Sequence, residues 1–320
     1  MKKKTVKILK IILPLMLGVF LIWFSYSKFS PEQLAEIKNH FKNANYRFLL
    51  LSLVFGFLSH LSRAYRWNFM LEPMGYKPKL MNNTMAVFTA YLFNLAIPRS
   101  GEVSRALVIN KYDNVPFDKA FGTIVAERVA DVLILGLLVL LALSMQFDAL
   151  KDFLLDLIPL QKLIVGILIL GALGITGILF VYKTSFSISI KIRNLVSGLK
   201  DGLLSILKMK KVWPFILHTI FIWVMYIAMF YICIYALEET SSFSFSTVIA
   251  AFVVGSFAIA FTNGGFGSYP FFIAEILLLF GISATVGTAF GWIVWISQFV
   301  MILIFGGLSL LLLPVYNRNK

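Results

Sequence analysis

Charged residues are scarce in this chain, and that scarcity excludes a water-soluble protein. Only 14% of its 320 residues are charged, whereas 59% are hydrophobic. Soluble globular domains carry about 25% charged and roughly 45–50% apolar residues. The chain therefore has too little polar surface to cover a body in water. Since helices satisfy their own backbone hydrogen bonds in lipid, the composition predicts an all-α polytopic membrane protein with a single membrane domain over residues 1–320.

Residues that carry metal, disulfide or catalytic chemistry are also few. There is one cysteine, Cys233, and the three histidines, His40, His60 and His218, lie far apart without the spacing of metal ligands. A single cysteine can form no internal disulfide. No phosphate-binding Gly-rich loop ending in Lys-Ser/Thr and no HExxH motif is present. The sequence thus predicts no metal, no cofactor and no enzyme.

Acidic residues are outnumbered: 15 stand against 29 Lys and Arg, for a net charge of +14. In a membrane protein, cationic loops stay on the cytoplasmic side. This accounts for the positive charge, so we expect no nucleic-acid partner.

The N-terminus is basic and leads into an apolar run over residues 8–24. That run is longer than the core of a signal peptide, about 7–15 residues, which favours an uncleaved helix over a leader. The predicted location is the cytoplasmic (inner) membrane, with both termini inside.

Long apolar runs account for most of the chain. A membrane-crossing helix needs about 20 apolar residues, and six runs qualify: residues 8–26, 47–71, 117–145, 162–182, 213–237 and 285–313. Two further segments each consist of a longer leg, a breaker and a shorter leg: residues 85–97 with 103–110, and 247–261 with 271–280. The short legs cannot cross about 30 Å of hydrocarbon. We predict two re-entrant hairpins, with two kinked spans as the alternative, and therefore eight apolar segments.

The order of these segments suggests an inverted repeat. The second and fifth spans begin near residues 47 and 213, and the spans after the hairpins begin near 117 and 285. Each half, 1–150 and 151–320, reads span, span, hairpin, span. With hairpins in both halves, the basic connector 183–211 faces the cytoplasm, as the positive-inside rule favours. Inverted halves with interrupted helices are typical of transporters, whose site lies where the breaks meet.

The first breaker carries charge inside an apolar region, which usually indicates a site. Arg99 and Glu102 lie at the tip, and Arg105 follows one turn later, where it could pair with Glu102. Free backbone amides at Ser100 and Gly101, together with the positive helix end, suit an anion. A phosphate-bearing headgroup, held by Arg99, Arg105 and these amides, is the natural candidate. The alternative is that Arg99 and Glu102 pair only to staple the hairpin.

Other polar residues extend this site. The helix over 117–145 carries Glu127, Arg128 and Asp131 at membrane depth, which could pair with the arginines of the hairpin, relay protons or form a structural ion network. Near the inner end of the second span, Arg63 and Arg66 are interfacial anchors or an entrance for acidic headgroups. The second breaker offers Asn263, Gly264 and Gly265, which permit unwound backbone and hydrogen bonding to a headgroup.

Three stretches carry a family resemblance: Arg63-Ala64-Tyr65-Arg66-Trp67, Ile97-Pro98-Arg99-Ser100-Gly101-Glu102, and Val125 through Asp131, with Gly264-Gly265-Phe266-Gly267 later. In this order they resemble the flippase-like membrane domain of lysylphosphatidylglycerol synthases. The resemblance covers nearly the whole chain. It implies two re-entrant elements and lipid movement between leaflets, with Arg99, Glu102, Glu127, Arg128 and Asp131 at motif positions.

Two departures limit what the resemblance implies. The full synthases carry a soluble aminoacyl-transfer domain that this sequence does not show, so aminoacyl-lipid synthesis is not expected. The family often has an acid where this chain has Pro270. The leading hypothesis is a lipid translocase for an anionic lipid or lipid-linked phosphate. The alternatives are a non-catalytic lipid-binding partner of a lipid- or glycan-synthesis enzyme, and a structural scaffold.

Overall fold

The computed structural model describes residues 2–97, 99–147 and 209–318, together with short stretches and single positions between 148 and 208. Throughout the long described ranges the regular structure is helical. The α-helices are α1 (Lys2–Tyr26), α2 (Pro31–Asn43), α3 (Tyr46–Leu71), α4 (Leu80–Ala96), α5 (Ser100–Asp113), α6 (Phe117–Met145), α10 (Val212–Cys233), α11 (Phe245–Phe261), α12 (Ser268–Leu279) and α13 (Ala284–Tyr316). Two 3-10 turns extend α3 and α10: η1 (Glu72–Met74) and η2 (Ile234–Ala236).

Three described helices are long and apolar enough to cross a membrane. They are α3 with η1, α10 with η2, and α13. A fourth span results if α1 and α2, which meet at an angle of 113°, count as one bent crossing. The predicted segment 117–145 forms a single helix of 29 residues, whereas most of the predicted span 162–182 and of the connector 183–211 lies outside the described residues. The number of six full spans therefore stays a prediction.

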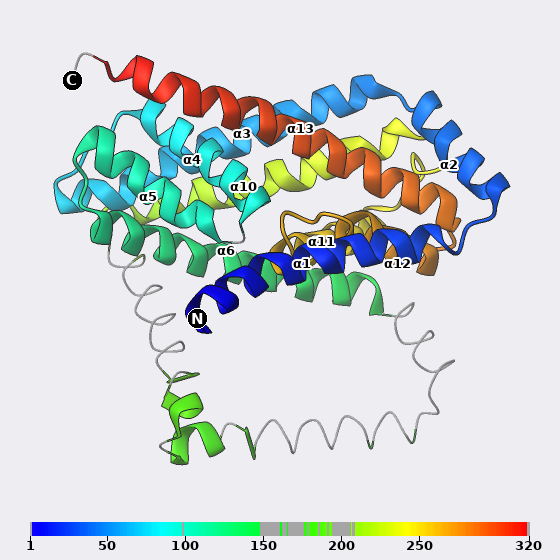
Figure 1. Ribbon diagram of the computed structural model, residues 1–320, viewed down its shortest axis with the longest axis horizontal. Helices are drawn as coiled ribbons and strands as arrows, with labels where there is room; N and C mark the ends of the chain where they lie inside the picture. Colours follow the sequence, from blue (N-terminus) through cyan, green and yellow to red (C-terminus); the bar gives the residue numbers. More distant parts are fainter. Residues whose placement is uncertain are drawn as a thin grey trace.

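Both predicted breaks interrupt helices, and each pair of legs packs together as a hairpin. The first break, at residues 97–99, separates α4 from α5, and the second, at residues 262–267, separates α11 from α12. In Figure 1 the α4–α5 hairpin occupies the left of the molecule and α11–α12 the right. Their tips touch, since a Cβ added at Gly264 would lie 2.6 Å from Leu95 Cδ2. Opposed hairpins are the arrangement that the predicted repeat requires, while the halves themselves stay a prediction.

Each hairpin has its own hydrophobic core. Around α4 and α5, buried side chains of α3 and α6 such as Trp67 and Ile124 enclose Ala106 and Ile109. Around α11 and α12, a larger core joins α2, α10 and α13. In the first hairpin the legs approach closely at Gly101, where an added Cβ would clash with the Ala90 carbonyl oxygen. Such small residues let membrane helices pack backbone to backbone, which fixes the hairpin tips at the centre of the bundle.

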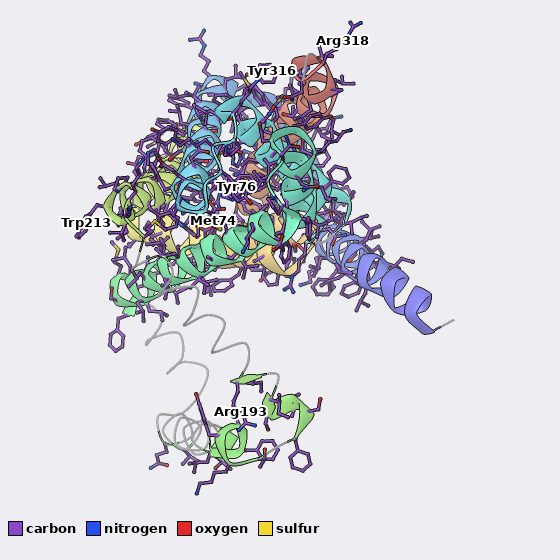
Figure 2. The ribbon with its side chains drawn as sticks, turned by 90° about the vertical axis from the view of Figure 1, so that its left-hand side faces the viewer. Met74, Tyr76, Arg193, Trp213, Tyr316 and Arg318 are labelled. Carbon is purple, nitrogen blue, oxygen red and sulfur yellow. The ribbon has the colours of Figure 1, made fainter. Side chains whose placement is uncertain are left out.

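One end of the bundle gathers basic residues. Met74 at the end of η1, Trp213 at the start of α10 and Tyr316 at the end of α13 face the viewer together in Figure 2. Lys211 pairs with Glu72 at 2.6 Å, and the Lys79 ammonium lies 5.3 Å from the centre of the Tyr316 ring. Because cytoplasmic loops carry the excess of Lys and Arg, this is the end that the sequence predicts to face the cytoplasm.

Helix α1 stands at the edge of the bundle, with its N-terminal part projecting from it in Figure 2. It packs mainly along α12. The contact depends on Gly18, where an added Cβ would clash with the Phe266 carbonyl oxygen. Since Pro14 lines the central cavity described below, α1 forms part of a lateral wall.

Replacing Gly18 with leucine is expected to push α1 away from α12, because a backbone oxygen cannot yield as a flexible side chain does. The measurement is cross-linking by a short bismaleimide between cysteines placed at Phe24 and Phe271, whose ring centres lie 6.2 Å apart. Cross-linked yield should fall at least severalfold in the leucine variant. Gly136→Leu on α6, where an added Cβ meets nothing within 4 Å, serves as the control. An unchanged yield in Gly18→Leu would contradict the contact.

Candidate functional site

The two hairpin tips meet at a cavity of about 640 Å³. Its wall includes residues of α3, α4, α5, α6, α10, α11, α12 and α13, so the whole bundle contributes to it. Five charged side chains line it: Arg63, Arg99, Glu102, Arg128 and Asp131. The volume falls in the range of about 300–1,000 Å³ that small-molecule sites occupy. Charge at this depth between apolar helices usually faces a partner or a substrate.

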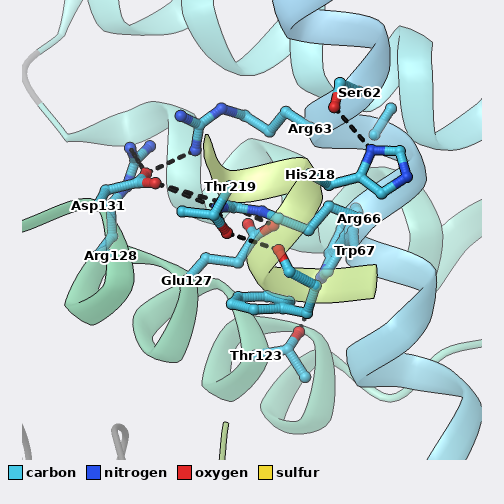
Figure 3. Close-up of polar contacts among 12 residues, drawn as sticks. Ser62, Arg63, Arg66, Trp67, Thr123, Glu127, Arg128, Asp131, His218 and Thr219 are labelled. Carbon is cyan, nitrogen blue, oxygen red and sulfur yellow. Dashed lines mark hydrogen bonds and ion pairs between the residues drawn. The ribbon is translucent and has the colours of Figure 1, made fainter. Parts of the chain in front are cut away.

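An ion network forms one wall, where α3 faces α6 (Figure 3). Arg63 and Arg66 are three residues apart on α3, and Glu127 and Asp131 are four apart on α6, so both pairs project from one face of their helix. Arg63 Nη1 donates to Asp131 Oδ2 at 2.7 Å, and Arg66 Nη2 lies 3.3 Å from Asp131 Oδ1. Arg66 Nη1 also donates to Thr219 Oγ1 of α10 at 2.7 Å. The network therefore ties three helices together.

These positions correct the prediction for Arg63 and Arg66. Both were expected to be interfacial anchors or an entrance, yet their side chains are 3% and 0% exposed. Only Arg63 reaches the cavity wall. The physical reason is that acids on α6 stand opposite them, so the guanidinium groups turn inward instead of extending to the membrane surface. The matching charge spacing on two apolar segments was the sequence signal for this arrangement.

Arg105 belongs to the network and not to the cavity wall. Its Nη1 donates to Glu127 Oε2 at 2.5 Å, and its guanidinium carbon lies 3.8 Å from the centre of the Trp67 ring. Trp67 is held in turn by a 2.8 Å hydrogen bond from its Nε1 to Thr123 Oγ1. Of the alternatives for the acids of α6, the structure shows Arg105 paired with Glu127. The predicted role of Arg105 as a headgroup ligand is not supported, because its side chain is buried against Glu127 and Trp67 and does not line the cavity.

Glu102, near the tip of the first hairpin, pairs with a different arginine from the one that its spacing along α5 predicted. Glu102 does not pair with Arg105; instead Arg128 Nη2 lies 3.0 Å from Glu102 Oε1. Arg128 also reaches Asp131 at 3.4 Å, as its i,i+3 spacing predicted. The Arg128 side chain remains 42% exposed, so it spans from the buried network to the cavity. Pairing between helices replaces the pairing along α5.

Arg99 is the cation at the tip itself. Its backbone adopts φ 61° and ψ 15°, the left-handed region, directly before α5. Its side chain is exposed and lines the cavity. Among the described residues it has no ion-pair partner, so the staple between Arg99 and Glu102 is not formed. Three arginines and two acids thus line the cavity, and the wall carries a net positive charge.

Backbone amides at the first tip are less available than predicted. The Gly101 N–H donates to Asn94 Oδ1 at 2.7 Å, and the Ser100 N–H donates to the Ile97 carbonyl at 3.2 Å. The prediction that these two amides are free is wrong, because the Asn94 side chain caps one across the hairpin and the backbone carbonyl of Ile97 accepts from the other. Their remaining role is to hold the tip rigid behind Arg99.

The second tip combines unwound backbone with a buried amide. Gly264 and Gly265 have φ of 60° and 82°, values that favour glycine. The Gly264 carbonyl accepts a hydrogen bond from Trp295 Nε1 at 2.8 Å. Asn263 is 4% exposed, lines the cavity, and its Oδ1 has no hydrogen-bond partner. Of the three residues predicted to bind a headgroup at this tip, Asn263 and Gly264 line the cavity and Gly265 does not.

Several cavity residues escaped the sequence analysis. Tyr91 on α4 and Tyr226 on α10 share a hydrogen bond of 2.9 Å between their hydroxyls, and the His60 ring lies 4.4 Å from that of Tyr91. Trp223 lines the same wall one turn before Tyr226. His60 lies three residues before Arg63 on one face of α3, and this spacing was the available signal. The two tyrosines and Trp223 gave no sequence signal, because 15% of the chain is aromatic and single aromatic residues do not stand out in it.

Comparisons with known proteins match parts of the chain to two curated relatives. The UPF0104 membrane protein MJ1595 of Methanocaldococcus jannaschii is 30% identical over 95 residues, which cover 29% of this chain and 28% of that protein. Glycosyltransferase AglD of Haloferax volcanii is 35% identical over 72 residues, 22% of this chain and 12% of that protein. The matches thus span 28% and 12% of the length of these relatives. No solved structure gives a significant match.

A family model covers far more of the chain. The model of the lysylphosphatidylglycerol synthase TM region matches residues 11–306, from α1 into α13. That range includes both hairpins, the ion network and every residue of the cavity wall named above. It accords with the resemblance carried by the Arg63, Arg99 and Glu127 stretches. The chain is thus a multi-pass membrane protein that belongs to the family of the lysylphosphatidylglycerol synthase transmembrane region.

Proposed function

We propose that this protein is a lipid translocase that takes a phosphate-bearing headgroup into the cavity between its hairpin tips. The observation that carries the proposal is Arg99, a tip cation that lines the cavity and has no ion-pair partner among the described residues. Placing an unpaired cation between apolar helices is costly. A lipid phosphate would supply the missing anion, and a guanidinium can hold it through two parallel hydrogen bonds.

The rest of the charge set supports this division of roles. Arg66 and Arg105 are buried and pair with Glu127, Asp131 and Thr219, so they hold the helices together. Arg63 and Arg128 line the cavity but already pair with Asp131. They would strengthen the positive field that a headgroup meets without being its main ligands. Of the arginines that line the cavity, Arg99 is the one whose guanidinium has no ion-pair partner among the described residues.

The opposed hairpins supply a route for alternating access. Their tips touch at Leu95 and Gly264, and each hairpin comes from a different end of the bundle (Figure 1). Movement of one hairpin would open the cavity toward one leaflet while the other kept it closed, as in transporters built from inverted repeats. The acyl chains would remain in lipid, and α1 would border the path.

Arg99→Gly is the sharpest test of the proposal. Glycine keeps the positive φ at no steric cost, and it should even relieve roughly 1–2 kcal/mol of left-handed strain, so the fold is retained while the guanidinium is removed. In liposomes with fluorescent anionic lipids, we expect leaflet exchange to slow about tenfold or more. Arg99→Lys keeps the charge without the fork and should fall between.

The control for this experiment is thermal melting of each variant in detergent. Arg99→Gly should melt no lower than the wild type. Exchange by Arg99→Gly at the wild-type rate would rule out headgroup binding at this arginine and leave the translocase proposal without its main support.

A second candidate is a non-catalytic membrane component that binds a lipid-linked intermediate for a synthesis enzyme. The observation favouring it is the match to part of glycosyltransferase AglD. This candidate predicts co-purification with a glycosyltransferase and no leaflet exchange by the protein alone. Exchange by the purified protein would decide against it.

A further inference from the structure

Five residues that line the central cavity have a buried side-chain atom without a hydrogen-bond partner. Two of these atoms, Arg63 Nε and Glu102 Oε2, belong to groups that already form ion pairs, and the other three belong to uncharged cavity residues. These three atoms are His60 Nδ1 on α3, Trp223 Nε1 on α10 and Asn263 Oδ1 at the second hairpin tip. All three residues line the cavity, and His60 and Asn263 are each only 4% exposed. Buried polar atoms without partners are costly. Three such atoms from three separate elements around one cavity indicate a ligand that bonds to them.

The chemistry of these atoms goes beyond a phosphate. An indole N–H can only donate, an amide oxygen can only accept, and a histidine Nδ1 does one or the other by tautomer. A phosphate diester has acceptors and no donor, so it cannot satisfy Asn263 Oδ1. A hydroxyl group both donates and accepts, and several hydroxyls on one ring could meet all three atoms at once.

The walls between these atoms are aromatic. The Trp223 and Tyr226 rings lie edge to face at 6.1 Å, and Tyr226 is joined to Tyr91 through their hydroxyls. A sugar or cyclitol ring has apolar C–H faces bordered by hydroxyls, so it fits a wall where aromatic faces alternate with hydrogen-bonding atoms. A short headgroup such as ethanolamine would leave most of this wall without contacts.

We infer that the lipid headgroup is a polyhydroxylated ring joined to phosphate, such as a sugar phosphate or an inositol phosphate. The phosphate would meet Arg99, and the ring would extend across the cavity to Asn263 and Trp223. This inference rests on the proposed function and names its substrate class. Asn263 and Trp223 then determine specificity, while Arg99 supplies the affinity that all phosphate lipids share.

The test compares two lipids of equal charge and equal acyl chains, phosphatidylinositol and phosphatidylmethanol. Both are phosphate diesters, and only the first has ring hydroxyls. Affinities of the full-length protein in detergent are measured by native mass spectrometry. We expect phosphatidylinositol to bind about tenfold more tightly, as two or three additional hydrogen bonds would produce. Soluble inositol 1-phosphate should bind far more weakly than the lipid.

Variants of the protein test its contacts with the ring and its contact with the phosphate separately. Asn263→Leu and Trp223→Phe should each reduce the preference for phosphatidylinositol severalfold and leave the affinity for phosphatidylmethanol unchanged. Arg99→Gly should weaken both lipids equally and keep their ratio. Trp213→Phe, at a tryptophan that is 72% exposed at the end of the bundle, is the matched control and should behave as the wild type. Trp223→Phe preserves an aromatic side chain, so it tests the inference even if Asn263→Leu fails to fold.

Each other outcome overturns a distinct claim. Equal affinity of the wild type for the two lipids, or a ratio that neither cavity variant changes, would mean that water satisfies the three atoms and would overturn the inference. Failure of both lipids to bind a folded protein would reject the proposed function itself. Binding of soluble inositol 1-phosphate as tightly as phosphatidylinositol would reassign the cavity to a free polyol phosphate.

Discussion

Asp131→Ala is expected to lower the free energy of unfolding by about 3–5 kcal/mol, the cost of leaving buried charge without its partner. Asp131 is the acid on which Arg63, Arg66 and Arg128 converge. Its removal strands Arg63, which is 3% exposed, and leaves Arg66 with only Glu127 and Thr219. Titration with SDS in mixed micelles measures the loss, and tryptophan fluorescence reports unfolding.

Two companion variants identify the cause. Asp118→Ala removes an exposed acid from the first turn of the same helix and should cost no more than about 1 kcal/mol. The double variant Arg63→Leu with Asp131→Leu removes one buried pair as a unit. It should be less destabilised than Asp131→Ala, because fewer unpaired charges remain. A double variant less stable than the single one would show that the network stabilises through direct attraction and not by neutralising buried cations.

The helix boundaries could be predicted closely from the sequence, because they depend on local signals. The span expected at 47–71 is α3 (Tyr46–Leu71), and that expected at 285–313 lies inside α13 (Ala284–Tyr316). The breakers fall where α4 and α11 end. At the start of α2, Ser30 and Gln33 form the capping box that their spacing predicts. In each case an apolar run or a cap decides the structure over a few neighbouring residues.

The partners of the charged residues could not be predicted in the same way. Spacing along α5 allowed Glu102 to pair with Arg105, yet each pairs with α6 instead. Spacing shows which residues share a face of a helix, and it does not show which other helix that face meets. Arg99 is a further case, since a left-handed backbone at a non-glycine residue has no local signal. It arises because α5 must turn back along α4.

These pairings separate two kinds of intramembrane arginine. Arg66 and Arg105 are enclosed by acids and aromatic rings and hold helices together. Arg99 is held at the tip by backbone geometry and faces open space in the cavity. Loss of an enclosed arginine should therefore reduce stability, and loss of the tip arginine should reduce transport alone. The sequence motif contains both kinds side by side, so only the fold distinguishes them.

Locking the two hairpin tips together is expected to abolish lipid exchange. An ideal Cβ at Gly264 lies 3.9 Å from Leu95 Cα, close enough for cysteines at 95 and 264 to form a disulfide. The only native cysteine, Cys233, is fully buried and can be replaced with alanine beforehand. If alternating access separates the tips, the oxidised protein should exchange lipids no faster than protein-free liposomes, and a reducing agent should restore exchange. Gly264→Cys alone accounts for the strain of a side chain at φ 60°, roughly 1–2 kcal/mol. Undiminished exchange through a fully cross-linked protein would mean that the tips form a fixed site and that headgroups pass beside them.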